Sequence, residues 1–150
     1  MTGTPSTVPT ESRSPLRVVK DQRKTITHSL AQAAAVGAPQ TWVLSNHDVV
    51  RHATRLGYSQ TPGLQKIEGI GADDPQPDAA LGLRRARAAT AVMLALPGSA
   101  YLFQGEELGL PEATRLPDEA RQDPTFARTR GESTGRDGCR VPVPWEGGVP

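Results

Sequence analysis

Two short apolar runs separated by one long helix-forming segment restrict the folds open to this chain. Residues 41–45 (TWVLS) and 99–103 (SAYLF) are β-prone and too short to be helices. Between them, residues 79–96 place apolar side chains at helical spacing and end at Pro97 and Gly98. Strands joined by a long helical crossover pair in parallel, and parallel strands are usually buried on both faces. The sequence therefore predicts an α/β architecture with two such strands.

The remaining segments predict one more helix and several loops. Residues 16–35 carry apolar side chains at helical spacing, and Gly37 and Pro39 follow as stop signals. Residues 1–15 are rich in Ser, Thr and Pro, which predicts a disordered amino-terminal tail ahead of residues 16–150, the region that holds the predicted helices and strands. Loops are expected over residues 60–78 and everywhere after Gln104.

Composition excludes several classes of function. The 150 residues are 36% hydrophobic and only 4% aromatic, and a net charge of +1 gives no reason to expect nucleic acid or an anionic membrane as a partner. No apolar run approaches the roughly 20 residues that span a bilayer, and the amino terminus does not resemble a secretory signal. A single cysteine, Cys139, cannot form an internal disulfide. These features favour a soluble cytoplasmic protein.

The polar sequence Asn46-His47-Asp48 follows the first predicted strand directly. In barrel enzymes the carboxyl ends of the strands carry the catalytic side chains, so these residues are candidates for a site. Asn and Asp are also common in turns and helix caps, which is the structural alternative. One His-Asp pair falls short of the three or four ligands that a metal site normally has, so no metal is expected.

Three ordered segments carry a resemblance to a known family: residues 42–55 (WVLSNHDVVRHATR), 97–109 (PGSAYLFQGEELG) and 135–145 (GRDGCRVPVPW). The first is similar to the region around the seventh barrel strand of the family 13 glycoside hydrolases, the α-amylase superfamily, in its α-glucosidase and oligo-1,6-glucosidase branch. The second resembles the eighth strand and the loop after it, and the third the Arg-Asp segment before the last helix of that branch. The resemblance implies an α/β fold that is part of a (β/α)8 TIM barrel, from the helix before strand seven to the loops after strand eight.

The resemblance also implies roles for three residues. Asp48 matches the acidic residue that binds hydroxyl groups of the cleaved sugar and stabilises its oxocarbenium-like transition state. His47 matches a histidine that hydrogen-bonds the same sugar, and Arg136 matches an arginine that reaches into the substrate site. Such contacts accelerate the reaction because they strengthen as the sugar ring flattens. Without its flanking motif, Arg136 would be interpreted as a solvated loop charge.

The implied activity is hydrolysis of terminal α-linked glucose from short glucosides by a retaining mechanism, or transfer of that glucose to an acceptor. A retaining mechanism needs a nucleophilic carboxylate and an acid/base carboxyl about 5 Å apart. In this family both lie on earlier strands, and no segment here resembles them, nor are a cofactor or calcium ion expected. We therefore expect a truncated, inactive and poorly folding part of a glycosidase. The alternatives are a non-catalytic module that assembles with a partner supplying the earlier strands, and a remnant that only binds carbohydrate.

Other polar residues are predicted to be structural. Glu106 and Glu107 are expected to support their loop rather than act as an acid/base pair. Cys139 lies between a glycine and an arginine, a position that could lower its thiol pKa, but no histidine partner adjoins it, so it too is interpreted as structural. Packing and ion pairs at the barrel rim are expected of Arg51, Arg55 and Trp145, and helix-surface positions of His28 and His52.

Overall fold

The computed structural model describes residues 15–58 and 69–144, and the side chains from residue 20 onward. The chain divides into two compact units, residues 1–38 and 39–150. Three predictions fall on residues outside the described ranges. These are the tail over residues 1–15 except for Pro15, residues 60–68 of the loop over residues 60–78, and Trp145.

The first unit contains the helix α1, Pro15–Ala35. It ends as the sequence predicts, because Gly37 adopts a left-handed conformation with φ of 66°. The N–H group of Ala38 then donates to the carbonyl oxygen of Ala33 at 3.1 Å, which satisfies a carbonyl that the helix end would otherwise leave free. His28 is exposed on this helix, as predicted.

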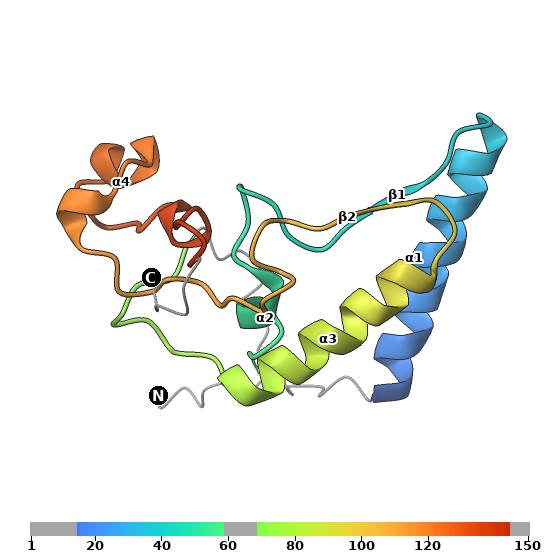
Figure 1. The fold of residues 1–150 in the computed structure, drawn as a ribbon, viewed down its shortest axis with the longest axis horizontal. Coiled ribbons are helices and arrows are strands. Elements are labelled where there is room, and N and C mark those ends of the chain that lie inside the picture. The colour runs from blue at the N-terminus through green and yellow to red at the C-terminus, as the bar shows by residue number, and fades with distance from the viewer. Residues whose placement is uncertain (1–14, 59–68, 145–150) are drawn as a thin grey trace, which may run out of the picture. The chain divides into compact units, whose positions relative to one another are not determined.

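The second unit contains two parallel strands, β1 (Thr41–Val43) and β2 (Ser99–Tyr101). They pair in the register Thr41 to Ser99, Trp42 to Ala100 and Val43 to Tyr101, and they run side by side in Figure 1. The helix α3, Ala79–Ala95, lies in the crossover between them and is capped by the Asp78 carboxylate, which accepts from Leu81 N at 2.9 Å. The predicted α/β arrangement with parallel strands is confirmed.

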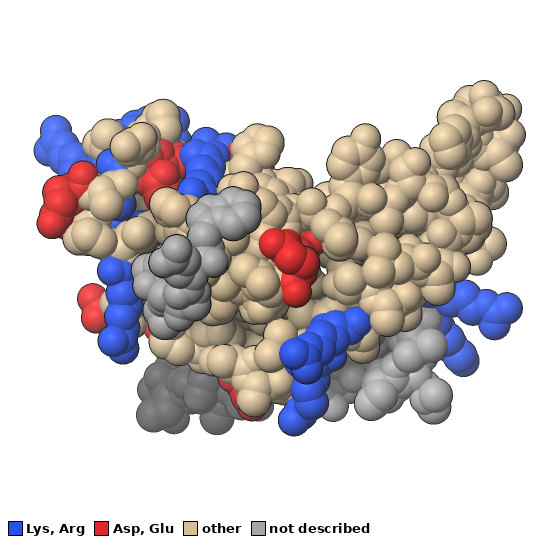
Figure 2. Space-filling model, in the orientation of Figure 1, with Lys and Arg blue, Asp and Glu red and all other residues tan. Residues whose placement is uncertain are grey.

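The prediction that both strands are buried on two faces is wrong for this structure. Only Trp42 is partly buried, whereas Val43 is 48% and Tyr101 63% exposed. A parallel sheet buries both faces when several strands and covering helices surround each strand, and two strands within this unit do not provide that. On the face shown in Figure 2, the surface over β1 and β2 carries no charged side chain.

The core of the second unit lies where α3 packs against a short helix, α2 (His52–Arg55). This close packing of the two helices requires a glycine at position 82. A side-chain carbon on Gly82 would lie 2.2 Å from the carbonyl oxygen of Ala53, which is too close. The buried face of α3 therefore follows Gly82, Ala86 and Met93. Apolar character alone does not identify this face, since Val92 on the same helix is 53% exposed.

The prediction that everything after Gln104 is loop is also wrong. This stretch contains the helix α4 (Pro124–Arg128) and two 3-10 turns, η1 (Asp118–Ala120) and η2 (Asp137–Cys139). Asp123 caps α4 by accepting from Thr125 N at 2.8 Å, and Pro124 occupies the first helical turn. These are standard helix-start signals, but a helix of five residues is too short to show an apolar period.

Candidate functional site

The turn after β1 presents the carboxylate of Asp48. Asn46 builds this turn, because its side-chain oxygen accepts a hydrogen bond from Asp48 N at 2.8 Å. The turn therefore uses the Asn46 side chain and leaves the Asp48 carboxylate free for other contacts. The Asp48 side chain is 50% exposed. The turn interpretation therefore applies to Asn46, and the Asp48 carboxylate takes no part in forming the turn.

Two arginines at the ends of η2 contact this carboxylate. Nη1 of Arg136 donates to Oδ1 of Asp48 at 2.6 Å, and Nη2 of Arg140 donates to the same oxygen at 3.3 Å. Nε of Arg140 also donates to the carbonyl oxygen of His47 at 2.8 Å. The turn after β1 and the η2 segment, 88 residues apart in the chain, thus form one side-chain cluster.

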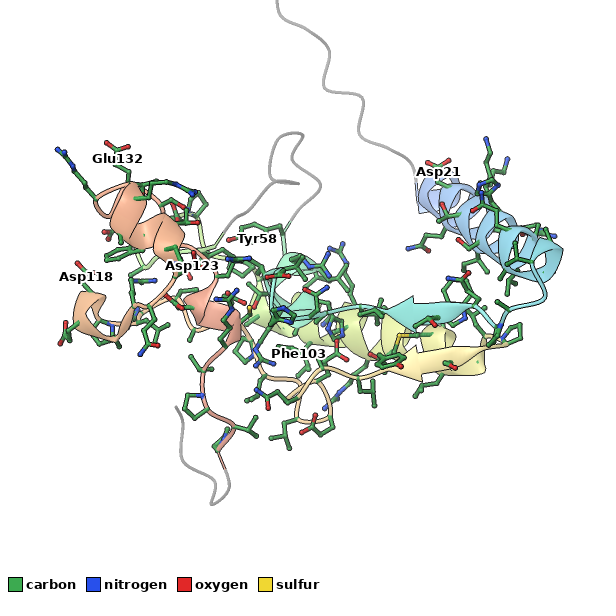
Figure 3. The ribbon with its side chains drawn as sticks, turned by 90° about the horizontal axis from the view of Figure 1, so that it is seen from above. Asp21, Tyr58, Phe103, Asp118, Asp123 and Glu132 are labelled. Atoms are coloured by element: carbon green, nitrogen blue, oxygen red, sulfur yellow. The ribbon has the colours of Figure 1, made fainter. Side chains whose placement is uncertain are left out.

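Behind the arginines lies a buried carboxylate, Asp123. Its side chain is fully buried, and its Oδ2 accepts from both the backbone N and the Nε of Arg136, at 3.1 and 2.7 Å. The hydrogen bond from the Arg136 guanidinium holds the pKa of Asp123 well below its usual range, although burial opposes this effect. Asp123 is therefore ionised at neutral pH. The sticks in Figure 3 show it between α4 and the η2 segment.

His47 is the third predicted site residue, and it lies at the exposed edge of the cluster. Its Nε2 is 3.3 Å from Oδ2 of Asp48, and its side chain is 70% exposed. The structure therefore brings Asp48, His47 and Arg136 together. A carboxylate flanked by an imidazole and a guanidinium can accept hydrogen bonds from hydroxyl groups while its neighbours donate to others.

Sequence reasoning missed Asp123 and Arg140. The signal for Asp123 was its position before Pro124, which marks a helix cap but not an arginine partner. Arg140 lies within the motif that identified Arg136, four residues further on, so it was available in the same segment.

Arg51 is buried beneath the candidate site, and the prediction that it lies at the barrel rim is wrong. It is 1% exposed, and its Nη1 and Nη2 donate to the carbonyl oxygens of Gln104 and Cys139 at 2.8 and 2.9 Å. Its guanidinium also lies 5.0 Å from the ring centre of Phe103. One side chain therefore ties the turn after β1 to the loop after β2 and to η2.

A second correction concerns His52, which is buried and not on a helix surface. Its Nδ1 lies 3.0 Å from Oγ of Ser45 and 3.1 Å from Oε1 of Glu106. Burial lowers the pKa of His52, although the Glu106 carboxylate opposes this. A catalytic triad places its serine and its acid on opposite ring nitrogens. Here both face Nδ1, so the cluster is structural.

The glutamates of the loop after β2 support that loop, as the sequence predicts. Glu106 and Glu107 accept from the backbone N–H groups of Phe103 and Gly105, each at 2.9 Å. The pKa of the Cys139 thiol is not lowered. Burial raises the pKa of this thiol to about 11, and its Sγ donates to the carbonyl oxygen of Arg136 at 3.1 Å.

Within residues 15–58 and 69–144, no three His, Cys, Asp or Glu side chains are grouped so that they could hold a metal ion. Across the same ranges, no helix has the length and apolar character needed to cross a membrane.

Comparison with known proteins assigns the family. Residues 6–149 match the family model of the α-amylase catalytic domain, so the chain belongs to this family of glycoside hydrolase domains. It is also 35% identical over 105 residues to a probable α-glucosidase of Rhizobium meliloti (strain 1021). That match covers 70% of this chain and 15% of the relative, so the chain spans a small part of the protein it resembles.

Proposed function

We propose that these residues form the glucose-binding side of an α-glucosidase-type retaining hydrolase. In this proposal β1 and β2 are strands seven and eight of a (β/α)8 barrel, and residues 16–150 belong to its carboxy-terminal part. Asp48 binds hydroxyl groups of the glucosyl unit and stabilises positive charge that develops on its ring. His47 and Arg136 donate to the same sugar. The observation that carries the proposal is the Asp48 carboxylate, held by Arg136 at the carboxyl end of a parallel strand in an α-amylase family domain.

The chemistry requires two further carboxyl groups, one as nucleophile and one as acid/base. We propose that these come from other strands of the barrel and not from the segments described here. The two guanidinium groups that donate to Oδ1 of Asp48 stabilise its negative charge, which makes this carboxylate a weaker nucleophile. Its position suits a role in binding and charge stabilisation.

The test is hydrolysis of nitrophenyl α-glucoside. The 150-residue chain alone should release no nitrophenol above background. A protein that joins it to the remaining strands should be active. Asp48→Asn in that protein should lower kcat/KM by about a hundredfold to a thousandfold, the loss typical of a removed transition-state contact. Turnover by the isolated chain that persists in Asp48→Asn would contradict the proposal.

A second candidate is a module that assembles with a separate polypeptide carrying the earlier strands. The exposed apolar side chains of Val43, Tyr101 and Leu102, on and beside the two strands, favour it, since a partner strand or helix would cover them. The DNA upstream of this gene distinguishes the candidates. Remaining strands encoded in the same reading frame favour a single hydrolase, and a separate intact gene favours assembly.

A further inference from the structure

Both arginines of the site span the same two carboxylates. Arg136 reaches Asp123 Oδ2 with its Nε at 2.7 Å and Asp48 Oδ1 with its Nη1 at 2.6 Å. Arg140 reaches the same two oxygens with Nη1 at 3.5 Å and Nη2 at 3.3 Å. Each guanidinium is therefore held at both ends, and the four side chains together carry no net charge.

The two carboxylates differ in burial and in anchoring. The Asp123 side chain is 0% exposed, and backbone N–H groups of Thr125 and Arg136 fix its two oxygens. The Asp48 side chain is 50% exposed and faces solvent. Asp123 is thus the fixed end of the network, and Asp48 is the end that a ligand can reach.

This arrangement treats the two oxygens of Asp48 differently. Both arginines donate to Oδ1, whereas Oδ2 lies on the side of His47, 3.3 Å from its Nε2. Two donors on one oxygen restrict rotation of the carboxylate, and they leave Oδ2 as the acceptor directed toward a ligand.

We infer that Asp123 and Arg140 are positioning residues for Asp48: the buried carboxylate fixes both guanidinium groups, and these set the orientation of the sugar-binding carboxylate. The inference rests on the proposed function of Asp48. A purely structural role for Asp123 as the cap of α4 explains only the contact of Oδ1 with Thr125 N. It leaves the contacts of Oδ2 with both arginines unexplained.

The test is a double-mutant cycle on the affinity for deoxynojirimycin, a glucose-shaped imino sugar, followed by NMR titration of the full chain. Arg140→Gln should weaken binding about tenfold, and Asp123→Asn at least as much, because Asn offers one acceptor oxygen where Asp123 uses two. Adding either change to Asp48→Asn should cause no further loss. Asp118→Asn is the matched control, because it makes the same chemical change five residues before Asp123. The Asp118 side chain, labelled in Figure 3, lies in η1 and is 82% exposed.

Circular dichroism of each variant identifies any that fail to fold, and Arg140→Gln is the milder change because its side chain is 31% exposed. Effects that add to that of Asp48→Asn, or an unchanged affinity in Arg140→Gln, would overturn the inference. A second readout needs no sugar. In protein labelled with ¹⁵N-arginine, the Nε–H signal of Arg136 should stand apart from those of exposed arginines and should merge with them in Asp123→Asn.

The two readouts separate the inference from the proposed function. If the wild-type chain binds no deoxynojirimycin but the Arg136 signal behaves as expected, the proposed sugar site is contradicted and the positioning network is supported. If the sugar binds and the Arg136 signal coincides with those of exposed arginines in the wild type, the network is contradicted.

Discussion

The carboxylate of Glu112 accepts a hydrogen bond from the backbone N–H of Arg51 at 2.9 Å, across 61 residues of chain. Glu112 is only 6% exposed, and burial raises its pKa to about 7 despite the favourable contacts with Arg51. The polypeptide around the candidate site is therefore held by a carboxyl group that changes charge near neutral pH.

This relationship predicts how stability depends on pH. Between the usual pKa of 4.5 and about 7, the folded chain binds more protons at Glu112 than the unfolded chain does. The free energy of unfolding should therefore fall as pH rises through this window, by on the order of 3 kcal/mol. Urea denaturation at about pH 5 and about pH 8 measures the difference. Glu112→Gln should largely remove it, and an equal dependence in this variant would assign the effect to other groups.

Arg51 should not be replaceable by lysine. Its guanidinium donates to two carbonyl oxygens in different segments and stacks on Phe103, and a single ammonium group cannot reproduce that planar geometry. We expect Arg51→Lys to reduce the free energy of unfolding by about 2 to 4 kcal/mol, because it leaves buried acceptors unpaired. The same substitution at Arg84, exposed on α3, is the control and should change stability little. Similar losses in both variants would mean that Arg51 has no special role.

Gly98 should tolerate no side chain. Its φ is +119°, and a side-chain carbon there would lie 2.1 Å from the carbonyl oxygen of Gln40, next to the start of both strands. Gly98→Ala should cost about 3 kcal/mol or more and disturb strand pairing. Gly131→Ala separates conformational strain from the clash, because its φ is also positive but its nearest neighbour is 3.7 Å away. If Gly98→Ala and Gly131→Ala lose the same free energy of unfolding, backbone strain and not the clash with Gln40 accounts for the effect.

Cys139 should be inert in the folded chain. A thiol pKa of about 11 in place of 9.0 lowers the thiolate fraction at neutral pH about a hundredfold, and the side chain is also fully buried. Alkylation by iodoacetamide should be at least that much slower in buffer than in urea. The measurement is unambiguous because the sequence contains one cysteine. Rapid alkylation without denaturant would contradict the burial of this residue.

Local patterns were sufficient to predict the helices and strands that carry clear periodicity. The end of α1 at Gly37 follows from short-range chemistry, and the parallel pairing of the two strands follows from one rule about crossovers. Burial was predicted less well, because it depends on how many neighbours each segment has. Val43 and Tyr101 have the composition of core strands and are nevertheless exposed.

The candidate site was predictable only through resemblance to a family. Composition and spacing could not pair Asp48 with Arg136, because nothing local links residues so far apart. Buried polar residues were the hardest to predict. His52 and Arg51 look like surface residues by type. Their burial depends on hydrogen-bond partners supplied by Ser45, Gln104 and Cys139, which the fold brings close.

The separation of 88 residues between Asp48 and Arg136 also determines when the site forms during synthesis. At 5 to 20 residues per second, the ribosome adds Arg136 between about 4 and about 18 seconds after Asp48. Arg140 follows within about a second. Throughout that interval the segment after β1 has been synthesised without its partners, so a chain released before Arg136 would carry Asp48 without either guanidinium contact.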